Sequence, residues 1–406
     1  MTQTSTARAT AQGTPGFVDP NARTPRPMRD VLSLDDLEPA ARRFLPGPVF
    51  GYVSGAAEDN LTRDENRAAF RDHKFVPRVL RNVAGRTQRT TLLGQTWDAP
   101  FGVAPMGMAA LSAYRGDIVL ARAARAAGIP AILSGSSLIS LEQVIEAAPG
   151  TWFQAYLPGQ TDRIEGLLTR AARAGYETLV VTLDVPVSGN RENLVRSGFS
   201  TPLRPSLRLA LQGLSRPRWL AGVWARTLLH HGMPHFENSY AERGAPILSR
   251  NVMRDFWGRD HFDWTHIAHI RRMWQGPLIL KGILHPDDVV IAKRHGVDGV
   301  ILSNHGGRQM DGAVSPMRVL ARSVEVAGDM PVMLDSGVRR GADVIKALAL
   351  GARFVFVGRP FMYAAALAGD AGVAHAVQIL RAEIDRNLAL LGLRDIAEIG
   401  RDILHP

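Results

Sequence analysis

The chain has 406 residues, of which 46% are apolar and 21% charged, and its 48 Lys and Arg against 38 Asp and Glu give a formal net charge of +10. This balance excludes intrinsic disorder as the main state, since a large core can form. The absence of cysteine excludes disulfides, a thiolate nucleophile, an iron–sulfur cluster and cysteine-bound zinc. No apolar stretch reaches the roughly 18 to 20 residues that span a bilayer, and no secretory signal core is found, so we expect a cytoplasmic protein.

The N-terminal segment predicts a tail followed by a helical extension. Residues 1–28 are rich in Thr, Ala, Arg, Pro and Gly without an apolar period, which predicts a disordered tail. Ser33 stands three residues before Asp36, a spacing typical of a helix start, and an amphipathic stretch runs on to Leu45. Pro39 lies inside this stretch, so the helix is either kinked or begins later. We assign residues 29–406 to one domain.

Short apolar runs alternate with segments of helical period from Phe101 onward. The runs are Phe101–Pro105, Pro130–Ser134, Thr151–Tyr156, Thr178–Asp184, Pro277–Lys281, Gly299–Ser303, Pro331–Asp335 and Phe354–Gly358. Continuous apolar runs between helices predict parallel strands that are covered on both faces. Eight such units predict an α/β protein with the TIM (β/α)8 barrel, and the long gap after the fourth run predicts an insertion there.

A doubly wound sheet is the competing architecture, but its glycine fingerprint is missing. No two of the 39 glycines are separated by a single residue, so no G-x-G motif exists. No G-x-x-x-x-G-K motif occurs either. Nicotinamide binding on a Rossmann fold and P-loop chemistry are therefore both disfavoured.

Chemically capable residues follow most of the predicted strands, at the end where a barrel gathers its active site. They include Gln154, Tyr156, Thr182, Asp184, Lys281, Ser303, His305, Arg308, Asp335 and Arg359. Lys281 follows Leu-Ile-Leu directly, and a desolvated ammonium needs an anionic partner or else loses its proton. Two functions remain open for it: a cation that faces an electron-rich cofactor, or the Schiff-base lysine of an aldolase.

Two further patterns concern a phosphate and a proton. Gly337-Val-Arg339-Arg340-Gly341 and Gly358-Arg359 are typical of a phosphate cradle, because glycine admits backbone N–H groups and arginine forks match phosphate. His305, beside Arg308, suits removal of a proton from a substrate whose anionic group the arginine holds. The histidines at 230, 231 and 235 have no carboxylate until Glu237, so we predict no metal site.

Four motifs carry a family resemblance, which covers the chain from about Ser33 to its C-terminus. They are Ser303–Gln309 (SNHGGRQ), Leu334–Gly341 (LDSGVRRG), Lys346–Ala352 (KALALGA) and Val357–Pro360 (VGRP). The chain resembles the FMN-dependent α-hydroxy-acid oxidase and dehydrogenase family, which includes membrane L-lactate dehydrogenase and mandelate dehydrogenase. The resemblance implies oxidation of a lactate- or mandelate-like (S)-2-hydroxy acid to the 2-oxo acid, with FMN as cofactor.

The resemblance also implies roles for individual residues. His305 would be the catalytic base and Asp184 would steady its imidazolium, while Lys281 would face the flavin N1 and O2 atoms. The substrate would contact Tyr52, Arg191, Arg308 and Tyr156, the last of which we count with the catalytic residues. The implied FMN contacts are Pro105, Met106, Gly107, Ser134, Gln154, Thr182, Lys281, Ser303, Asp335, Ser336, Gly337, Arg339, Gly358 and Arg359.

Three departures from the family pattern narrow the prediction. Ser336 stands where the family commonly has glycine. The loop at 133–137 is small where plant glycolate oxidases carry a tryptophan, which indicates a roomier pocket. Gly107 stands where an oxidase often has alanine, which favours a dehydrogenase.

The insertion, taken as residues 193–236, holds six arginines and no acid, interleaved with Leu and Trp. This composition is typical of a segment that lies in a membrane interface, and an active-site lid is the alternative. The resemblance implies a peripheral enzyme on the inner face of the cell membrane that passes electrons to a quinone. The family also implies a homo-oligomer, commonly a tetramer.

Three other functions stay open at this point. They are a soluble oxidase that uses oxygen and releases hydrogen peroxide, a Schiff-base aldolase, and a non-catalytic basic barrel that binds nucleic acid. We predict no nucleic-acid partner.

Overall fold

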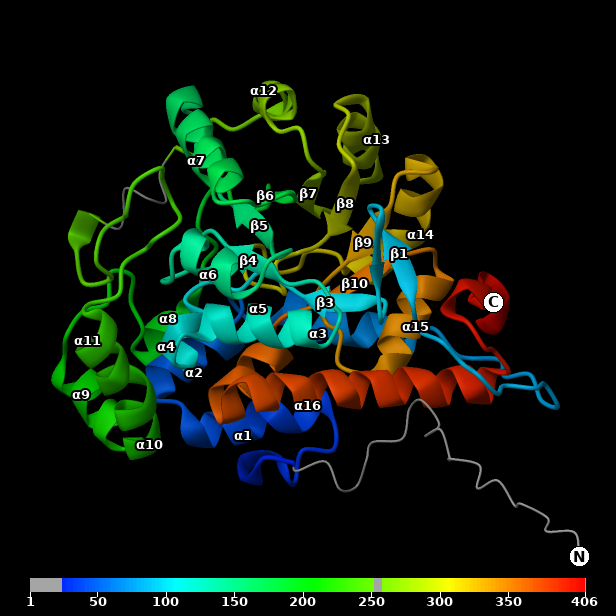
Figure 1. Cartoon of the computed structure of the whole chain (residues 1–406), viewed down its shortest axis with the longest axis horizontal. Helices are drawn as coiled ribbons and strands as arrows, with labels where there is room; N and C mark the ends of the chain where they lie inside the picture. The colour runs from blue at the N-terminus through cyan, green and yellow to red at the C-terminus, as the bar shows by residue number, and fades with distance from the viewer. Residues whose placement is uncertain (1–23, 252–257, 406) are drawn as a thin grey trace, which may run out of the picture.

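Eight parallel strands form a barrel at the centre of the computed structural model, which describes residues 24–251 and 258–405 (Figure 1). The strands are β3 (Phe101–Val103), β4 (Ile132–Ser134), β5 (Trp152–Ala155), β6 (Leu179–Thr182), β7 (Leu278–Ile283), β8 (Gly299–Leu302), β9 (Val332–Leu334) and β10 (Phe354–Val357). They pair in the order β3-β10-β9-β8-β7-β6-β5-β4, and a parallel bridge between Val103 and Ala131 joins the two ends. The predicted (β/α)8 barrel is confirmed.

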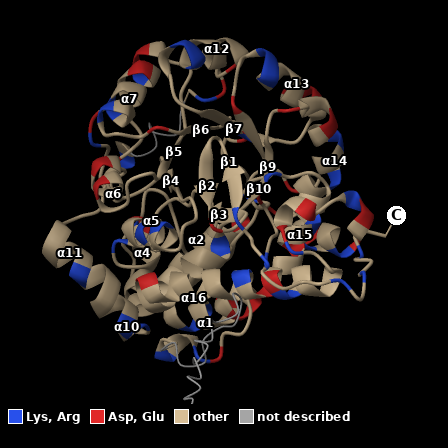
Figure 2. Cartoon of the chain, turned by 45° about the vertical axis from the view of Figure 1, so that its right-hand side comes forward, with Lys and Arg blue, Asp and Glu red and all other residues tan. Residues whose placement is uncertain are grey.

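A helix follows each strand and packs on the outside of the barrel (Figure 2). These helices are α5 (Gly116–Ala126), α6 (Leu141–Ala147), α7 (Thr161–Arg173), α12 (Trp264–Met273), α13 (Pro286–Arg294), α14 (Pro316–Ala327), α15 (Gly341–Ala349) and α16 (Arg359–Leu391). In α7 the buried residues Ile164, Leu167, Leu168 and Ala171 recur at helical spacing, so one apolar face meets the strands. Helix α16 is broken at Ala368 and Gly369.

The barrel interior is apolar and closed at its N-terminal end. Side chains of all the strands except β3 fill it, and the residue that follows β3 contributes too: Ala104, Ile132, Trp152, Val180, Ile279, Ile301, Met333, Phe354 and Phe356. A hairpin of β1 (Thr90–Leu92) and β2 (Gln95–Trp97) adds Leu92, Leu93 and Trp97 to this cluster. The sequence did not predict this hairpin, whose two strands are only three residues long each.

The N-terminal extension is helical, as predicted, and lies beside the barrel mouth. It comprises η2 (Leu34–Asp36), α1 (Leu37–Phe44), α2 (Gly47–Ser54), α3 (Leu61–Ala68) and η3 (Ala69–Arg71). The Ser33 amide donates to Asp36 Oδ2 at 2.8 Å, and α1 begins only at Leu37, so that Pro39 falls in its first turn. The predicted helix start at Ser33 and Asp36 is therefore confirmed. Of the two alternatives for Pro39, the structure has the one in which the α-helix begins later.

The predicted tail is wrong in its last residues. Residues 1–23 of it lie outside the described residues. Arg26–Met28, however, form the short helix η1, and the Met28 side chain is fully buried in the core. The ordered domain therefore begins before residue 29.

The insertion between β6 and β7 is largely helical and packs against the side of the barrel (Figure 1). It contains α8 (Glu192–Ser197), α9 (Leu207–Leu214), α10 (Pro217–Trp219), the π-helical turn η4 (Leu220–Ala225) and α11 (Arg226–His231). Trp219 is buried and its Nε1 donates to the carbonyl of Leu111 in α4 (Ala109–Ser112) at 2.8 Å. Buried tryptophan and valine side chains thus fix the insertion to the barrel.

The chain ends in two short helices, η6 (Ile396–Glu398) and η7 (Arg401–Ile403). Ile403 and Leu404 are buried, which ties this end to the core. Within residues 24–251 and 258–405, no helix has the length and apolarity needed to cross a bilayer.

Candidate active site

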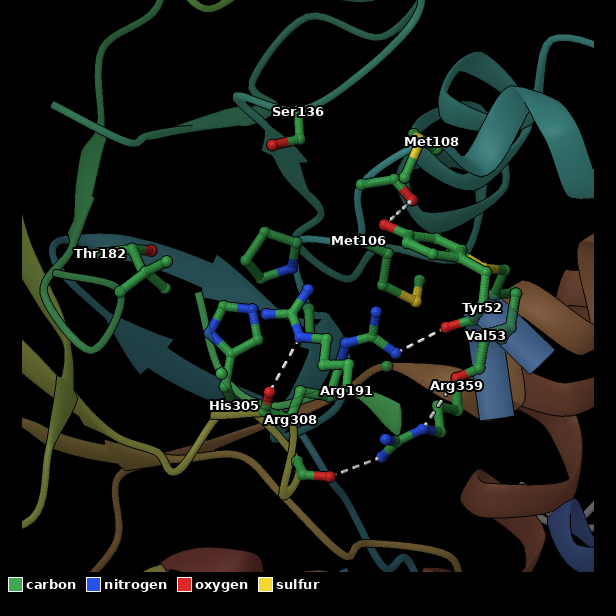
Figure 3. Close-up of a pocket in the computed structure, with 18 of the residues that line it drawn as sticks. Tyr52, Val53, Met106, Met108, Ser136, Thr182, Arg191, His305, Arg308 and Arg359 are labelled. Atoms are coloured by element: carbon green, nitrogen blue, oxygen red, sulfur yellow. Dashed lines mark hydrogen bonds between the residues drawn. The ribbon is translucent and has the colours of Figure 1, made fainter. Parts of the chain in front are cut away.

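A cavity of about 470 Å³ lies at the C-terminal end of the barrel (Figure 3). Most of the predicted site residues line it: Tyr52, Pro105, Met106, Gly107, Tyr156, Thr182, Arg191, Lys281, His305, Arg308, Asp335, Ser336, Gly337, Arg339, Gly358 and Arg359. The four others do not line it and instead hydrogen-bond to neighbouring residues: Ser134, Gln154, Asp184 and Ser303. The structure therefore brings the predicted residues into one site.

His305, just after β8, is paired with Asp184, just after β6. His305 Nδ1 lies 3.1 and 3.2 Å from the two carboxylate oxygens of Asp184. Because a carboxylate only accepts, Nδ1 carries the proton and Nε2 is the basic nitrogen. Nε2 lies 3.4 Å from the hydroxyl of Tyr156. At Gly282 (φ 106°) a Cβ would come within 2.7 Å of the Asp184 Cβ, so only glycine at this position leaves room for the Asp184 side chain.

The electrostatics of this pair favour a neutral histidine. Burial lowers the pKa of His305 below its usual value, and the charge of Asp184 opposes that effect only in part. Burial alone would raise the pKa of Asp184, but His305 and Lys281 outweigh it and the pKa is lowered. Both directions favour an ionised carboxylate beside a neutral imidazole, the arrangement of a general base with its orienting group.

Lys281, in β7, is buried and remains an ammonium. Its Nζ donates to Ser303 Oγ at 2.9 Å and lies 3.1 Å from Asp335 Oδ2. Burial would lower the pKa of Lys281, but the charges of Asp335 and Asp184 outweigh it and the pKa is raised. A Schiff-base lysine must be neutral to attack, so this environment favours the alternative of a fixed cation.

Three arginines in the cavity donate to uncharged oxygens. Arg359 donates to the carbonyls of Val53, Gly306 and Gly55 at 2.9 to 3.0 Å. Arg308 donates to the carbonyl of Tyr52 at 2.6 Å, and Arg191 donates to the carbonyl of Arg308 at 2.9 Å. The last two guanidinium groups lie between His305 and Tyr52 (Figure 3).

No ion pair with a carboxylate is found for these three arginines in the described part of the chain. Burial lowers the pKa of Arg359 to about 9 and that of Arg191 to about 10, and in both the charge of Arg308 adds to the effect. Buried cations without an anionic partner are costly. The cavity is therefore built to receive anionic groups.

The loops after β9 and β10 have the form of a phosphate cradle. At Gly337 (φ 87°) a Cβ would come within 2.2 Å of the Asn66 carbonyl oxygen, so only glycine fits. Ser336 also has a left-handed backbone (φ 75°), and its Oγ donates to Asp335 Oδ1 at 2.8 Å and accepts from the Gly306 amide at 3.1 Å. Burial lowers the pKa of Arg339, which belongs to the loop after β9.

The sequence analysis missed part of the cavity wall. Ser136 and four apolar residues of the insertion line it, namely Leu194, Val195, Phe199 and Phe236. Leu194, Val195 and Phe199 follow Arg191 closely in the sequence, which could have indicated that the insertion begins at the mouth. Arg259 also lines the cavity, with its guanidinium carbon 4.6 Å from the centre of the Tyr156 ring, and no motif marks it.

The insertion histidines are engaged elsewhere. His231 Nε2 lies 2.9 Å from the Tyr114 hydroxyl, and His235 Nδ1 lies 3.0 Å from the Gly244 carbonyl. Among the residues that the structure describes, no three His, Asp or Glu side chains converge as a metal site would require.

A barrel that carries a histidine–aspartate pair and a cationic cavity at its mouth has the features of an enzyme that binds an anionic, phosphorylated ligand there. Residues 41–406 match the family model of the FMN-dependent dehydrogenases. The chain belongs to this FMN-dependent family, whose members include mandelate and lactate dehydrogenases, and it is an oxidoreductase.

Relatives resemble the chain over nearly its whole length. It is 38% identical over 383 residues to (S)-mandelate dehydrogenase of Pseudomonas putida, covering 93% of this chain and 94% of that one. It is 39% identical over 381 residues to L-lactate dehydrogenase of Yersinia pestis, covering 92% and 98%. The crystal structure of the monotopic membrane protein (S)-mandelate dehydrogenase superposes with a TM-score of 0.87 at 37% identity, covering 93% and 100%.

The polar groups of the site fit FMN. Thr182 Oγ1, which lines the cavity, and Gln154 Nε2, in the neighbouring strand β5, are buried, and neither has a hydrogen-bond partner among the described residues. A buried polar atom without a partner is costly, whereas the polar edge of a flavin offers donors and acceptors for both. The same wall carries the Lys281 ammonium, and the glycine and arginine loops at 337–339 and 358–359 suit the phosphate tail.

Proposed function

We propose that the protein oxidises an (S)-2-hydroxy acid to the 2-oxo acid and passes the two electrons to a quinone-type acceptor at a membrane surface. The family membership supports the hydroxy-acid chemistry. The observation that carries the oxidation step is the hydrogen bond from His305 Nδ1 to Asp184, which leaves Nε2 free to accept a proton beside arginines that lack an acidic partner in the described structure.

Substrate binding begins with the carboxylate. Arg191 and Arg308 present forked donors beside His305, and a carboxylate accepts two parallel bonds from such a fork. The Tyr52 hydroxyl lies at the same wall, where it donates to the Gly107 carbonyl at 3.2 Å. A carboxylate held here brings C2 and its hydroxyl to His305 Nε2 and the Tyr156 hydroxyl.

His305 then accepts a proton from the substrate at Nε2. Asp184 accepts the Nδ1–H bond throughout and stabilises the imidazolium that forms. Bound FMN would supply the two-electron acceptor for this oxidation, and Lys281 would place a fixed positive charge beside it. Ser303 and Asp335 hold that ammonium in position.

The remaining cavity wall favours a substrate with a bulky apolar side chain. Leu194, Val195, Phe199 and Phe236 bring apolar surface from the insertion to the cavity. Ser136 is small, which leaves room beside the hydroxy-acid site. We therefore place an aromatic acid such as mandelate ahead of lactate in kcat/KM.

The membrane part of the proposal depends on the insertion. Leu207, Leu211 and Leu214 lie on one face of α9 and are 57 to 77% exposed, and Leu229 of α11 is 82% exposed. Exposed leucines beside arginines suit an interfacial segment. The related (S)-mandelate dehydrogenase is described as a monotopic membrane protein. We propose the inner face of the cell membrane as the site of attachment, and a homo-oligomer as the assembled form.

Anaerobic bleaching of the flavin absorption tests the oxidation directly. We expect (S)-mandelate to bleach the holoenzyme faster than (S)-lactate, with (R)-mandelate as the control that leaves the flavin oxidised. No bleaching by either (S) acid would contradict the proposal.

The acceptor is tested by reoxidation of the bleached enzyme. A water-soluble quinone should restore the flavin colour faster than air does. Release of hydrogen peroxide in air at the full rate of turnover would instead support a soluble oxidase.

A further inference from the structure

A second cavity, of about 480 Å³, lies on the outside of the barrel between α5, α16 and the insertion. It borders the break in α16, since Gly369 and Asp370 line it. Its apolar wall comes from Phe44, Ile118 and Val223, among others. This cavity shares no residue with the active-site cavity.

Four arginines line this cavity: Arg115, Arg122, Arg218 and Arg226. Arg122 is neutralised, because it donates to both carboxylate oxygens of Asp370 at 2.8 and 2.6 Å. For the other three, no ion pair occurs in the ranges 24–251 and 258–405. The cavity therefore carries an excess of positive charge beside an apolar wall.

Two of the three remaining guanidinium groups are held in place by uncharged neighbours. Arg226 has its guanidinium carbon 3.9 Å from the centre of the Tyr114 ring. Arg115 donates to Gln143 Oε1 at 2.7 Å, and its other Nη lies 3.3 Å from His231 Nε2. Held guanidinium groups lose little freedom when they bind an anion.

The cavity adjoins the surface that we propose to meet the membrane. Arg218 belongs to α10, which follows α9 and its exposed leucines, and Arg226 begins α11, which carries the exposed Leu229. Basic residues are visible on α10 and α11 in Figure 2. A lipid headgroup at this surface would meet the three arginines, while its glycerol and first methylenes would meet the apolar wall.

We propose that this cavity binds the phosphate of an anionic phospholipid headgroup, an inference that rests on the proposed membrane attachment. A phosphodiester accepts paired hydrogen bonds from guanidinium groups. An anionic headgroup has a net negative charge that compensates the excess positive charge of the cavity, whereas a zwitterionic headgroup does not. Free phosphate shares this chemistry but has no apolar group that could pack against the apolar wall. The cavity thus sets the orientation of the enzyme on the bilayer.

Two double variants distinguish specific binding in the cavity from non-specific electrostatic attraction between the basic insertion and an anionic membrane. Arg218→Gln with Arg226→Gln removes two charges from the cavity, whereas Arg204→Gln with Arg208→Gln removes two exposed charges of the insertion that do not line it. On vesicles that contain phosphatidylglycerol, we expect binding to weaken about 100-fold in the first variant and at most about tenfold in the second. Equal losses would refute the cavity while leaving membrane attachment in place.

The wild-type protein provides the second measurement, which does not depend on how a variant folds. Titration with dihexanoyl phosphatidylglycerol below its micelle concentration should give saturable binding, about tenfold tighter than inorganic phosphate or dihexanoyl phosphatidylcholine. Equal affinity for phosphate would overturn the lipid assignment in favour of a free-anion site. Absence of vesicle binding by the wild type would overturn both membrane proposals, and oxidation of the hydroxy acid with a soluble dye would still report on the active site.

Discussion

Arginine serves the barrel mouth and the insertion in opposite ways. At the mouth, Arg191 and Arg359 are held by carbonyl groups, and burial lowers the pKa of both. In the insertion, Arg204 and Arg208 are exposed to solvent and line neither cavity. A buried guanidinium is preorganised for one small anion of defined geometry, whereas an exposed one contributes to a field that attracts an extended charged surface. Residue type alone does not distinguish these uses, but burial does.

The largest effect should come from replacing the proposed base at the mouth. His305→Ala should slow flavin reduction by about 10⁴-fold, because no other group at this position can accept the proton. FMN should remain bound, since the residues around Gly337 and Gly358 are untouched. Stopped-flow absorbance under anaerobic conditions measures the reduction, and an undiminished rate would refute the role of His305.

The next prediction concerns pH. In the wild type the lowered pKa of His305 keeps the imidazole neutral, so kcat/KM should fall with acid only below about 6.5, the ordinary pKa of histidine. Asp184→Asn removes the charge that opposes this lowering, so the acid limb should move to lower pH while the rate falls roughly 10²- to 10³-fold. A pH–rate profile checks both, and a limb that moved upward would contradict the pairing.

The third prediction compares buried and exposed arginine directly. Arg359→Gln should weaken FMN binding by about 100-fold, because a buried charge-assisted contact to the phosphate is lost. Arg353, at the other end of β10 and exposed, provides the matched control Arg353→Gln, which should leave the affinity unchanged. The fluorescence of free FMN measures both dissociation constants.

The fourth prediction tests the insertion. Replacing Leu207, Leu211 and Leu214 together by Gln should reduce sedimentation with anionic vesicles by about tenfold or more, since the apolar face of α9 is lost. Val79 and Leu80 are at least as exposed but lie outside the insertion, so Val79→Gln with Leu80→Gln is the control. Dye reduction should persist in both variants. If the triple-leucine variant and the control variant bound vesicles equally, the result would favour the alternative that the insertion is an active-site lid.

The smallest effect should come from Ser336→Gly. Glycine would relieve the left-handed backbone, but the two hydrogen bonds of Ser336 Oγ would be lost, so the two changes nearly offset each other. We expect the free energy of unfolding to change by less than about 1 kcal/mol. Urea denaturation measures it.

The barrel could be predicted because its strands are buried on both faces and therefore read as continuous apolar runs. The β1–β2 hairpin could not, because its three-residue strands are half exposed and have no such pattern. Met28 was assigned to the tail because a single buried methionine gives no period.

The site follows the same logic. Lys281 lies within β7, and His305 and Arg359 follow β8 and β10, so their convergence could be predicted from the topology. Arg259 and Phe199 come from the long connection between β6 and β7, whose path over the mouth depends on tertiary packing rather than on local pattern.

The barrel is not equally strong around its circumference. Between β3 and β4 only the bridge of Val103 with Ala131 completes the ring in the described structure, whereas β6 and β7 share four paired positions. This seam should open first in native-state hydrogen exchange, with the amide of Val103, which donates to the Pro130 carbonyl, as its reporter. Because Pro105 to Gly107 follow β3 directly, breathing of the seam would loosen one side of the flavin pocket first.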